Sequence, residues 1–432
     1  MNRILTLLFC CFSLLTIQAE DNRSEILKVS NWIDYIDEQL IHEFEEWYEQ
    51  VTGEKVKVEY ETYVMPDSMY NKIQHHHKDY DVTCPPEYLV ERMLRHKLLL
   101  PIDTTDFTRT NTPNWLNGTS AYLDEAIQTF AEYSSIRVKD YAVPYQWGNT
   151  GVVFNTDYVS RQEVESWRFL FDPKYKGKIR IKDAFSDIYT ILIIYANYDN
   201  IQKGRTTRNL LASSLTEENL SIVKEQLVRI RPQIIGWEFD EGRNHMAAGE
   251  DWLAVTWNGE AQWAIDYAKP DTHLDFLVPK EGSDLWVDCW VIPAYAKNVK
   301  AASYWINFFS RPDNALRCMR RTHWTSAIAT PEMLAAVCDS TIEDTTDLSY
   351  FFGPKAKTVH LNRILYPDYS TIERMAIMRD IGNRQESMRE IWNTIKAYNH
   401  DQTWLIIGLV AVAVVLILIL AAVFYRYRYQ KR

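Results

Sequence analysis

The sequence predicts an α/β protein that folds into two lobes. Short apolar runs alternate with stretches in which apolar residues recur at helical spacing, which favours mostly parallel sheets covered by helices. This alternation occurs twice, before and after the segment "YAVPYQWGNTGVVFN", where Pro144, Gly148 and Gly151 interrupt two strands. The chain has 432 residues and is 47% hydrophobic, which is enough for two packed cores. Two lobes fit this length better than one very large sheet.

The first run of elements opens with a strand, a helix and a second strand. Residues 26–29 are apolar and predict the first strand, whereas Asp37 is a suitable N-cap for a helix that ends at Gly53. Apolar residues then alternate over 56–60, as in a half-buried strand. The remaining predicted elements are a helix at 68–74, a strand at 80–84, a helix at 86–96, an apolar stretch at 98–102, a strand at 179–181, a helix at 220–230 and a strand at 253–257.

The N-terminus has the layout of a secretory signal peptide. Arg3 precedes an apolar run over 4–17, and the small residue Ala19 precedes an acidic, polar stretch. We predict a signal peptide over 1–19 that is cleaved after Ala19. The alternative is an uncleaved N-terminal anchor, although the run is short for a membrane span.

A second apolar segment lies near the C-terminus. Residues 404–424 carry no charge, and about 20 such residues are needed to cross a bilayer. Arg426 and Arg428 follow at once, so the positive-inside rule places a tail over 425–432 in the cytoplasm. We therefore predict a transmembrane helix at 404–424 that anchors an exported domain. Because the tail is so short, a receptor that signals by itself is disfavoured.

Charge and cysteine content narrow the class of partner. The formal net charge is −11, and an acidic surface repels nucleic acid and anionic lipid, so we expect no nucleic-acid partner. No Cys or His pair occurs at metal-ligand spacing, and we predict no metal site and no cofactor. Disulfides are permitted outside the cytoplasm, and three pairings of the exported cysteines stay open. These are Cys84, Cys289, Cys318 and Cys338.

The stretch "LWVDCWV" at 285–291 has an unusual distribution of side chains. In an extended strand Trp286, Asp288 and Trp290 would lie on one face. A core disfavours the carboxylate, and a solvated face needs no paired indoles. Each of these tryptophans alone would more often be a core residue. The combination indicates a binding surface.

Similar pairs of an aromatic ring and a carboxylate occur at other strand ends. They lie in "NWIDYI", "PPEYLV", "KDAFSDIY" and "TWNGEAQW". A slender cation with ammonium groups joined by methylenes needs both components, because rings cover the stem and attract ammonium while carboxylates accept its hydrogen bonds. Two acids have simpler explanations, since Asp34 could cap a turn and Glu260 could stabilise a helix N-terminus.

An enzyme is the alternative from another class. Paired carboxylates with aromatic rings are also typical of glycosidases, and the sequence does not distinguish a sugar-sized cleft from a polyamine slot. No G-x-S-x-G, H-E-x-x-H or phosphate-binding glycine loop occurs. We expect no catalytic residues and no enzymatic activity.

The exported part resembles the spermidine/putrescine-binding proteins of bacterial ABC importers. The motifs that carry the resemblance are "SNWIDYI", "YDVTCPPEYLVERM", "YAVPYQWGNTGVVFN", "SWRFLFDPKYKGKI", "VTWNGEAQWA", "PKEGSDLWVDCWVIPAYAKN", "INFFSRPDNA" and "LYPD", in the family's order over about residues 26–397. The resemblance implies a two-lobed periplasmic-binding-protein type II fold with a hinge between the lobes. It places lobe 1 at 20–143 and 289–330, and lobe 2 at 144–288 and 331–400.

The resemblance also implies which residues bind ligand. Carried over motif by motif, they are Trp32, Asp34, Tyr35, Tyr88, Asp187, Trp257, Glu260, Trp286, Asp288 and Trp324, with Glu87 and Asp183 as weaker candidates. The sequence departs from the family pattern at four positions, where Ala184, Pro86, Ile33 and Met378 replace more usual residues. These departures leave the preference between diamine and triamine open.

The implied function is that of a substrate-binding subunit. It would capture putrescine, spermidine or both, deliver them to the permease subunits of an ABC importer, and act as a monomer in the periplasm, anchored to the inner membrane by its C-terminal helix. The alternatives are a binding protein for another small organic cation or a metal complex, or the exported carbohydrate-active enzyme.

Overall fold

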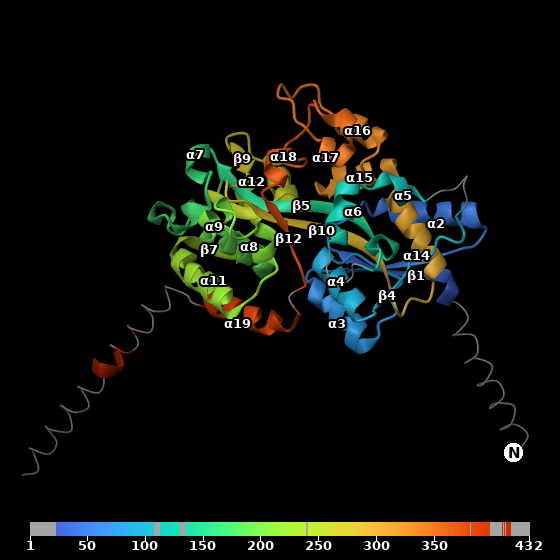
Figure 1. Ribbon diagram of the computed structural model, residues 1–432, viewed down its shortest axis with the longest axis horizontal. Helices are drawn as coiled ribbons and strands as arrows, with labels where there is room; N and C mark the ends of the chain where they lie inside the picture. The colour runs from blue at the N-terminus through green and yellow to red at the C-terminus, as the bar shows by residue number, and fades with distance from the viewer. Residues whose placement is uncertain are drawn as a thin grey trace, which may run out of the picture.

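Two lobes lie side by side in the computed structural model and share a sheet that continues from one lobe into the other (Figure 1). The structure describes residues 23–107, 113–129, 135–238, 241–380 and 382–397, together with 408, 410 and 412–415. Within these residues the strand order is β2-β1-β3-β10-β5-β8-β6-β7, and β4, β9, β11 and β12 pair at the sides. The two-lobed α/β fold predicted from the sequence is therefore confirmed.

The first lobe begins with the predicted strand, helix and strand. Strand β1 (Ile26–Trp32) pairs in parallel with β2 (Lys57–Tyr63), and α2 (Gln39–Thr52) connects them. Helix α2 buries one stripe of side chains against the sheet, as its spacing predicts. It ends at Gly53, whose φ of 74° lies in the left-handed region that glycine adopts readily.

Further elements complete the first lobe around this sheet. They are α3 (Pro66–His76), β3 (Val82–Thr83), α4 (Glu87–Arg95), β4 (Leu99–Leu100), α5 (Asn114–Gly118), α6 (Ala121–Gln128), α14 (Val299–Phe309), α15 (Pro312–Thr322) and β11 (Thr325–Ser326). Strand β3 runs parallel to β1, which places the carboxyl ends of both strands at one edge of the sheet.

Two long strands join the lobes. Strands β5 (Ala142–Asn155) and β10 (Ser283–Pro293) are buried along their whole length and run antiparallel to each other. The second half of β5 pairs with β8 and β9 of the other lobe. In this antiparallel pair Trp286 lies opposite Gly148, and a Cβ at Gly148 would lie 2.4 Å from the Trp286 ring. Glycine at this position lets the indole pack against the backbone.

The second lobe has a mostly parallel sheet covered by helices. Strand β6 (Ile179–Lys182) runs parallel to both β7 (Ile234–Glu238) and β8 (Leu253–Trp257). The other elements of this lobe are α7 (Arg161–Val164), α8 (Phe185–Ala196), α9 (Tyr198–Gln202), α10 (Arg208–Ala212), α11 (Glu217–Ile230), α12 (Gly242–Ala247), α13 (Asn258–Asp266) and β9 (Leu274–Leu277). Helix α8 begins shortly after the end of β6, and α13 begins directly after β8.

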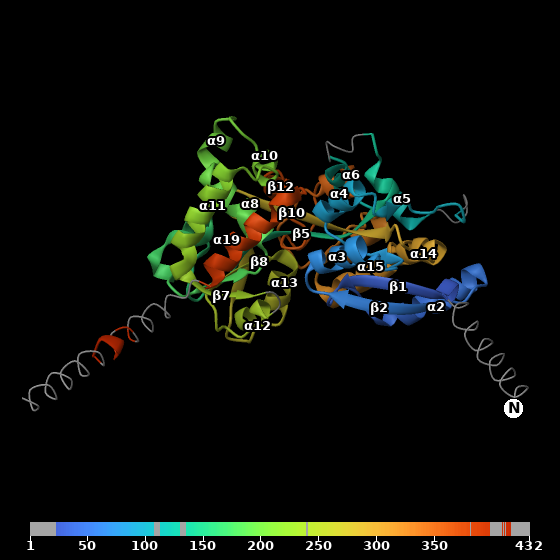
Figure 2. The same cartoon turned by 90° about the horizontal axis from the view of Figure 1, so that it is seen from below.

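The C-terminal part of the described chain contacts both lobes. Its elements are α16 (Pro331–Val337), α17 (Ser349–Phe352), α18 (Tyr369–Ile372), β12 (Met375–Ile377) and α19 (Gln385–Ala397). Phe351 is buried in the same cluster as Leu123 of the first lobe, whereas Trp392 of α19 is buried with Ile179 of the second. Figures 1 and 2 show α19 against α11. The predicted lobe limits assigned all of 331–400 to lobe 2, and they stay a prediction.

The predicted C-terminal transmembrane helix has to be corrected. Within the part of the chain that the structure describes, no helix is both long enough and apolar enough to cross a membrane. Of the predicted span at 404–424, only 408, 410 and 412–415 are described, and the predicted signal peptide at 1–19 and tail at 425–432 lie outside the described residues. The fold class is the two-lobed α/β fold without that helix.

The four cysteines of the described region are free thiols. Cys84, Cys289 and Cys318 are buried, and Cys338 is exposed. Burial raises the pKa of the Cys84 and Cys289 thiols well above its ordinary value, which keeps them protonated and unreactive. The pairing question that the sequence left open therefore does not arise for these residues.

Candidate binding pocket

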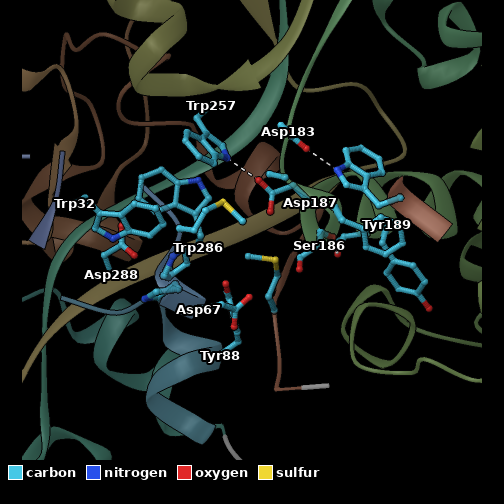
Figure 3. A pocket seen from close by; sticks show the side chains of 18 of the residues that line it. Trp32, Asp67, Tyr88, Asp183, Ser186, Asp187, Tyr189, Trp257, Trp286 and Asp288 are labelled. Carbon is cyan, nitrogen blue, oxygen red and sulfur yellow. Dashed lines mark hydrogen bonds between the residues drawn. The ribbon is translucent and has the colours of Figure 1, made fainter. Parts of the chain in front are cut away.

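A cavity of about 390 Å³ opens between the two lobes (Figure 3). Its walls come from the end of β1, the start of α4, the start of α8, the end of β8, the middle of β10, and α19. The structure brings to it every candidate residue named from the sequence except Glu87. The cavity is lined by Trp32, Asp34, Tyr35, Tyr88, Asp183, Asp187, Trp257, Glu260, Trp286, Asp288 and Trp324.

Three indole rings form a continuous apolar wall. Trp286 packs edge-on against Trp324 with ring centroids 5.6 Å apart, and Trp257 lies 5.9 Å from Trp324 and 6.4 Å from Trp286. On the first lobe, Tyr35 lies 5.8 Å from Trp324 and 6.2 Å from Trp32. Such a wall can cover a methylene chain, and its ring faces attract cations.

Asp288 projects from β10 into this aromatic surround. It is only 5% exposed and accepts a short hydrogen bond from the Tyr35 hydroxyl. Burial raises the pKa of the Asp288 carboxyl to about 7, with the hydrogen bonds it accepts acting in the opposite direction. A buried carboxylate with neutral donors alone favours the arrival of a cation.

The neighbouring Trp290 does not share this environment. The register shift between Asp288 and Cys289 leaves Tyr145 of β5 without a partner in β10. Strand β10 itself keeps its alternation, because Val287 and Cys289 are buried in one cluster and Trp286 and Trp290 in another. Trp290 is fully buried in the first-lobe core, where its ring lies 6.1 Å from that of Trp305. Trp290 therefore shares the predicted face with Trp286, but it lies in the core instead of lining the cavity.

Asp187 faces the cavity from the second lobe. It lies in the first turn of α8, is 4% exposed, and accepts a hydrogen bond of 2.6 Å from Trp257 Nε1 (Figure 3). Burial raises the pKa of this carboxyl well above its ordinary value, and the nearby Asp284 carboxyl raises it further. Like Asp288, it is a buried acid held by an uncharged donor.

Glu260 has a cationic partner within the protein. It lies in the first turn of α13, where it forms an ion pair with Lys182 and accepts a hydrogen bond from the Thr256 hydroxyl. Lys182 is 1% exposed, and its ammonium lies 4.2 Å from the centroid of the Trp257 ring. The helix-dipole explanation of Glu260 is thus incomplete, because a buried lysine at the end of β6 pairs with it.

Two further acids at the edge of the cavity are also paired with cations. Asp183 accepts a hydrogen bond of 2.5 Å from Trp392 Nε1 and forms an ion pair with Lys396, both from α19. Asp34 is largely exposed, with a φ of 53°, and lies 3.4 Å from Arg243. Its left-handed backbone fits the expected turn after β1.

Glu87 lies behind the cavity wall. Its side chain is fully buried, and Oε2 accepts a hydrogen bond of 2.8 Å from the backbone N–H of Val287. Burial raises the pKa of this carboxyl well above its usual value. Glu87 therefore hydrogen-bonds to the backbone of β10 and does not line the cavity, which makes it a weaker candidate for ligand contact than its neighbour Tyr88.

Sequence reasoning missed the contribution of α19 and of Lys182. Met388, Trp392 and Ile395 recur at helical spacing and indicate an amphipathic helix, but nothing in that spacing says which lobe it packs against. Lys182 ends the apolar strand "IRIK", and no local pattern shows that its ammonium turns inward. Both contributions depend on long-range packing.

Comparison with known proteins agrees with this geometry. Residues 39–344 match the family described as bacterial extracellular solute-binding protein. The chain is 28% identical over 381 residues to the spermidine/putrescine-binding periplasmic protein of Escherichia coli (strain K12), covering 88% of this chain and 93% of that protein. It is 25% identical over 338 residues to the putrescine-binding periplasmic protein PotF of the same organism, covering 74% and 83%.

Solved structures share the fold. A putative spermidine/putrescine ABC transporter from Listeria monocytogenes superposes with a TM-score of 0.67 at 25% identity, covering 87% of this chain and 100% of that one. The spermidine/putrescine ABC transporter substrate-binding protein PotD from Streptococcus pneumoniae gives a TM-score of 0.64 at 24% identity, covering 87% and 99%. The resemblance inferred from the motifs is confirmed. On the family match over 39–344 and the two-lobed fold, this chain belongs to the bacterial extracellular solute-binding proteins.

Proposed function

We propose that this protein is the substrate-binding subunit of an ABC importer and that its pocket captures polyamines. The relatives named above are described as spermidine/putrescine-binding and putrescine-binding proteins, and the chain covers most of their length. The observation that carries the proposal is the pair Asp187 and Asp288, two buried carboxylates that face an indole-walled cavity, accept hydrogen bonds from neutral donors and form no ion pair among the described residues. Permease subunits of an importer would be the partners.

The same groups account for how a diamine would be held. Each ammonium group donates charge-assisted hydrogen bonds to a carboxylate, while the methylene chain lies against the Trp286 and Trp257 rings. The free energy comes from replacing the water around a buried acid by a fixed cation. No bond of the ligand needs to break, so binding and release are sufficient for this role.

We further propose that a bound ligand draws the lobes together about β5 and β10, the two strands that connect them. Asp288 and Tyr35 belong to the first-lobe side of the cavity, whereas Asp187 and Trp257 belong to the second. A ligand that contacts both sides stabilises the closed arrangement, and β5 and β10 are the segments that can act as the hinge.

Polyamines should stabilise the folded protein, and sugars should not. At a free concentration of 100 times Kd a ligand adds about 2.7 kcal/mol to the free energy of unfolding, because it binds only the folded state. Putrescine and spermidine are expected to raise the thermal midpoint by several degrees, as measured by calorimetric melting. Maltose at the same concentration is the control. A shift with maltose alone would favour the carbohydrate-active alternative and contradict the proposal.

Polyamine binding is expected to weaken as the pH falls below 7. The carboxyl of Asp288 has a pKa raised to about 7, so it is mostly protonated at pH 6 and mostly ionised at pH 8. Aliphatic amines stay protonated over this range. If only the ionised form pairs with ammonium, Kd rises about tenfold between pH 8 and pH 6.

Calorimetric titrations at pH 6, 7 and 8 test this dependence. The raised pKa of Asp187 acts in the same direction and steepens the change. Asp288→Asn, which has no proton to lose, is the control and should reduce the slope. Tighter binding at pH 6 than at pH 8 would be incompatible with an ammonium bound to these acids.

A further inference from the structure

The carboxylates that line the cavity differ in whether the protein itself supplies a cation. Six of them face it: Asp34, Asp67, Asp183, Asp187, Glu260 and Asp288. Four have a lysine or arginine nitrogen within 4.0 Å. The pairs are Asp34 with Arg243, Asp67 with Arg92, Asp183 with Lys396, and Glu260 with Lys182. Among the described residues, Asp187 and Asp288 have no such cation. These two are also the acids fixed by Trp257 and Tyr35.

Lys182 occupies the position that a ligand ammonium would take at Glu260. Its amine is enclosed, paired with the Glu260 carboxylate and held over the Trp257 ring at 4.2 Å. Both attractive features, the acid and the ring face, are therefore engaged from within the chain. A ligand ammonium placed here would find the charge of Glu260 already neutralised by Lys182, and the Lys182 ammonium would repel it.

Lys396 does the same for Asp183, the residue that follows Lys182 at the end of β6. Helix α19 is held there because Met388, Trp392 and Ile395 are buried in the core of that lobe. From this helix, Trp392 Nε1 donates a hydrogen bond to one carboxylate oxygen of Asp183, and Lys396 Nζ donates one to the other. Asp183 is thus satisfied by two groups of α19.

The remaining acids flank the indole wall. Figure 3 shows Asp288 and Asp187 on either side of the Trp286 ring. Resting on the polyamine function proposed above, we propose that Lys182 and Lys396 are built-in counter-ions that limit the site to ligands with two positive charges, so that it selects a linear diamine over a triamine. The two acids without a cationic partner match the two ammonium groups of a diamine. A third ammonium gains no carboxylate and loses its water.

Calorimetric titration of the whole protein with putrescine and spermidine at pH 8 tests this selection. The unmodified protein is expected to bind putrescine at least tenfold more tightly than spermidine. Lys396→Met removes a charge at similar side-chain length and releases Asp183, so spermidine affinity should rise at least tenfold while putrescine affinity changes less than threefold. Lys396→Arg should keep the original preference.

Two controls separate local pairing from general charge. Lys300→Met changes the net charge equally but removes a partly exposed lysine that pairs with Glu54 and Asp106, away from the cavity, and should leave the preference unchanged. Lys182→Met/Glu260→Gln removes an ion pair without leaving a buried charge, and should also keep the preference for putrescine.

The outcomes distinguish this inference from the function on which it rests. If the unmodified protein binds spermidine as tightly as putrescine or more tightly, or if Lys396→Met alters their ratio less than twofold, the counter-ion role is wrong while the polyamine function stands. If neither amine binds, both proposals fall. A shift toward spermidine with Lys300→Met would also overturn the role of Lys396.

Discussion

Asp288→Asn is expected to weaken polyamine binding by about 2 to 5 kcal/mol, which corresponds to a rise in Kd of about 30-fold to more than 1,000-fold. The carboxylate is 5% exposed, and its hydrogen-bond partner is the neutral Tyr35 hydroxyl. An ammonium bound beside the substituted amide would be desolvated without an anion to compensate it. The measurement is a calorimetric titration with putrescine at pH 8, where the carboxyl of the unmodified protein is ionised.

The substitution is suited to separating binding from folding. An amide oxygen can still accept the Tyr35 hydrogen bond, so the wall between β10 and the first lobe keeps its contact. Asp34→Asn is the matched control, because that acid is exposed, is already paired with Arg243, and sits at a φ of 53° that asparagine tolerates. Its effect should stay below about 1 kcal/mol. A loss below about 0.5 kcal/mol for Asp288→Asn would contradict the role given to this residue.

Local patterns predicted the elements of the fold well wherever one face of an element is buried. The strand and helix that open the first lobe follow from the apolar spacing around Leu40 and Phe44 and from the stop at Gly53. The second-lobe helix at Leu220 and Leu227 follows from the same signal. The sequence also indicated that the indoles and acids at strand ends would meet, since carboxyl ends of parallel strands share an edge.

What the sequence could not predict depends on contacts between distant segments. Alternation placed Trp286 and Trp290 on one face correctly, but it could not show that Trp286 would line the cavity while Trp290 would be enclosed in the first-lobe core. The pairing of Lys182 with Glu260 spans 78 positions, and that of Lys396 with Asp183 spans 213. The long apolar segment at 404–424 satisfied a composition rule for a membrane helix, and composition alone led to the prediction that had to be corrected.

The charge state of the site shows the same limit. In the sequence Asp183, Asp187, Glu260 and Asp288 look like equivalent acids, because each stands near an aromatic residue. In the structure they fall into two kinds, those with a lysine partner and those with a neutral donor. Burial raises the pKa of the second kind, Asp187 and Asp288. The charge of Lys182 partly opposes the rise at Asp187, but among the described residues neither acid forms an ion pair, so protonation of these two acids competes with ligand binding.

Lys182→Met is expected to lower the free energy of unfolding by about 3 to 5 kcal/mol. The substitution leaves Glu260 buried beside the Trp257 ring, where the Thr256 hydroxyl still donates a hydrogen bond to it. Breaking a buried pair from one side is far more destabilising than removing both members, because the surviving charge is left in a medium of low polarity. The measurement is the midpoint of urea unfolding together with its slope, without ligand.

Two variants define what this loss means. Lys182→Met/Glu260→Gln removes both charges and should recover most of the stability, since glutamine can still accept the Thr256 hydrogen bond. Lys300→Met breaks the surface pairing of a partly exposed lysine with Glu54 and Asp106, and should change stability by at most about 1 kcal/mol. If the single variant were no less stable than the double, Glu260 would not depend on Lys182 for its charge. The Lys182 ammonium over the Trp257 ring would then have no role in stabilising the pocket. The expected loss would instead show that the Lys182–Glu260 ion pair, which makes Glu260 unavailable to the ligand, also stabilises the second lobe.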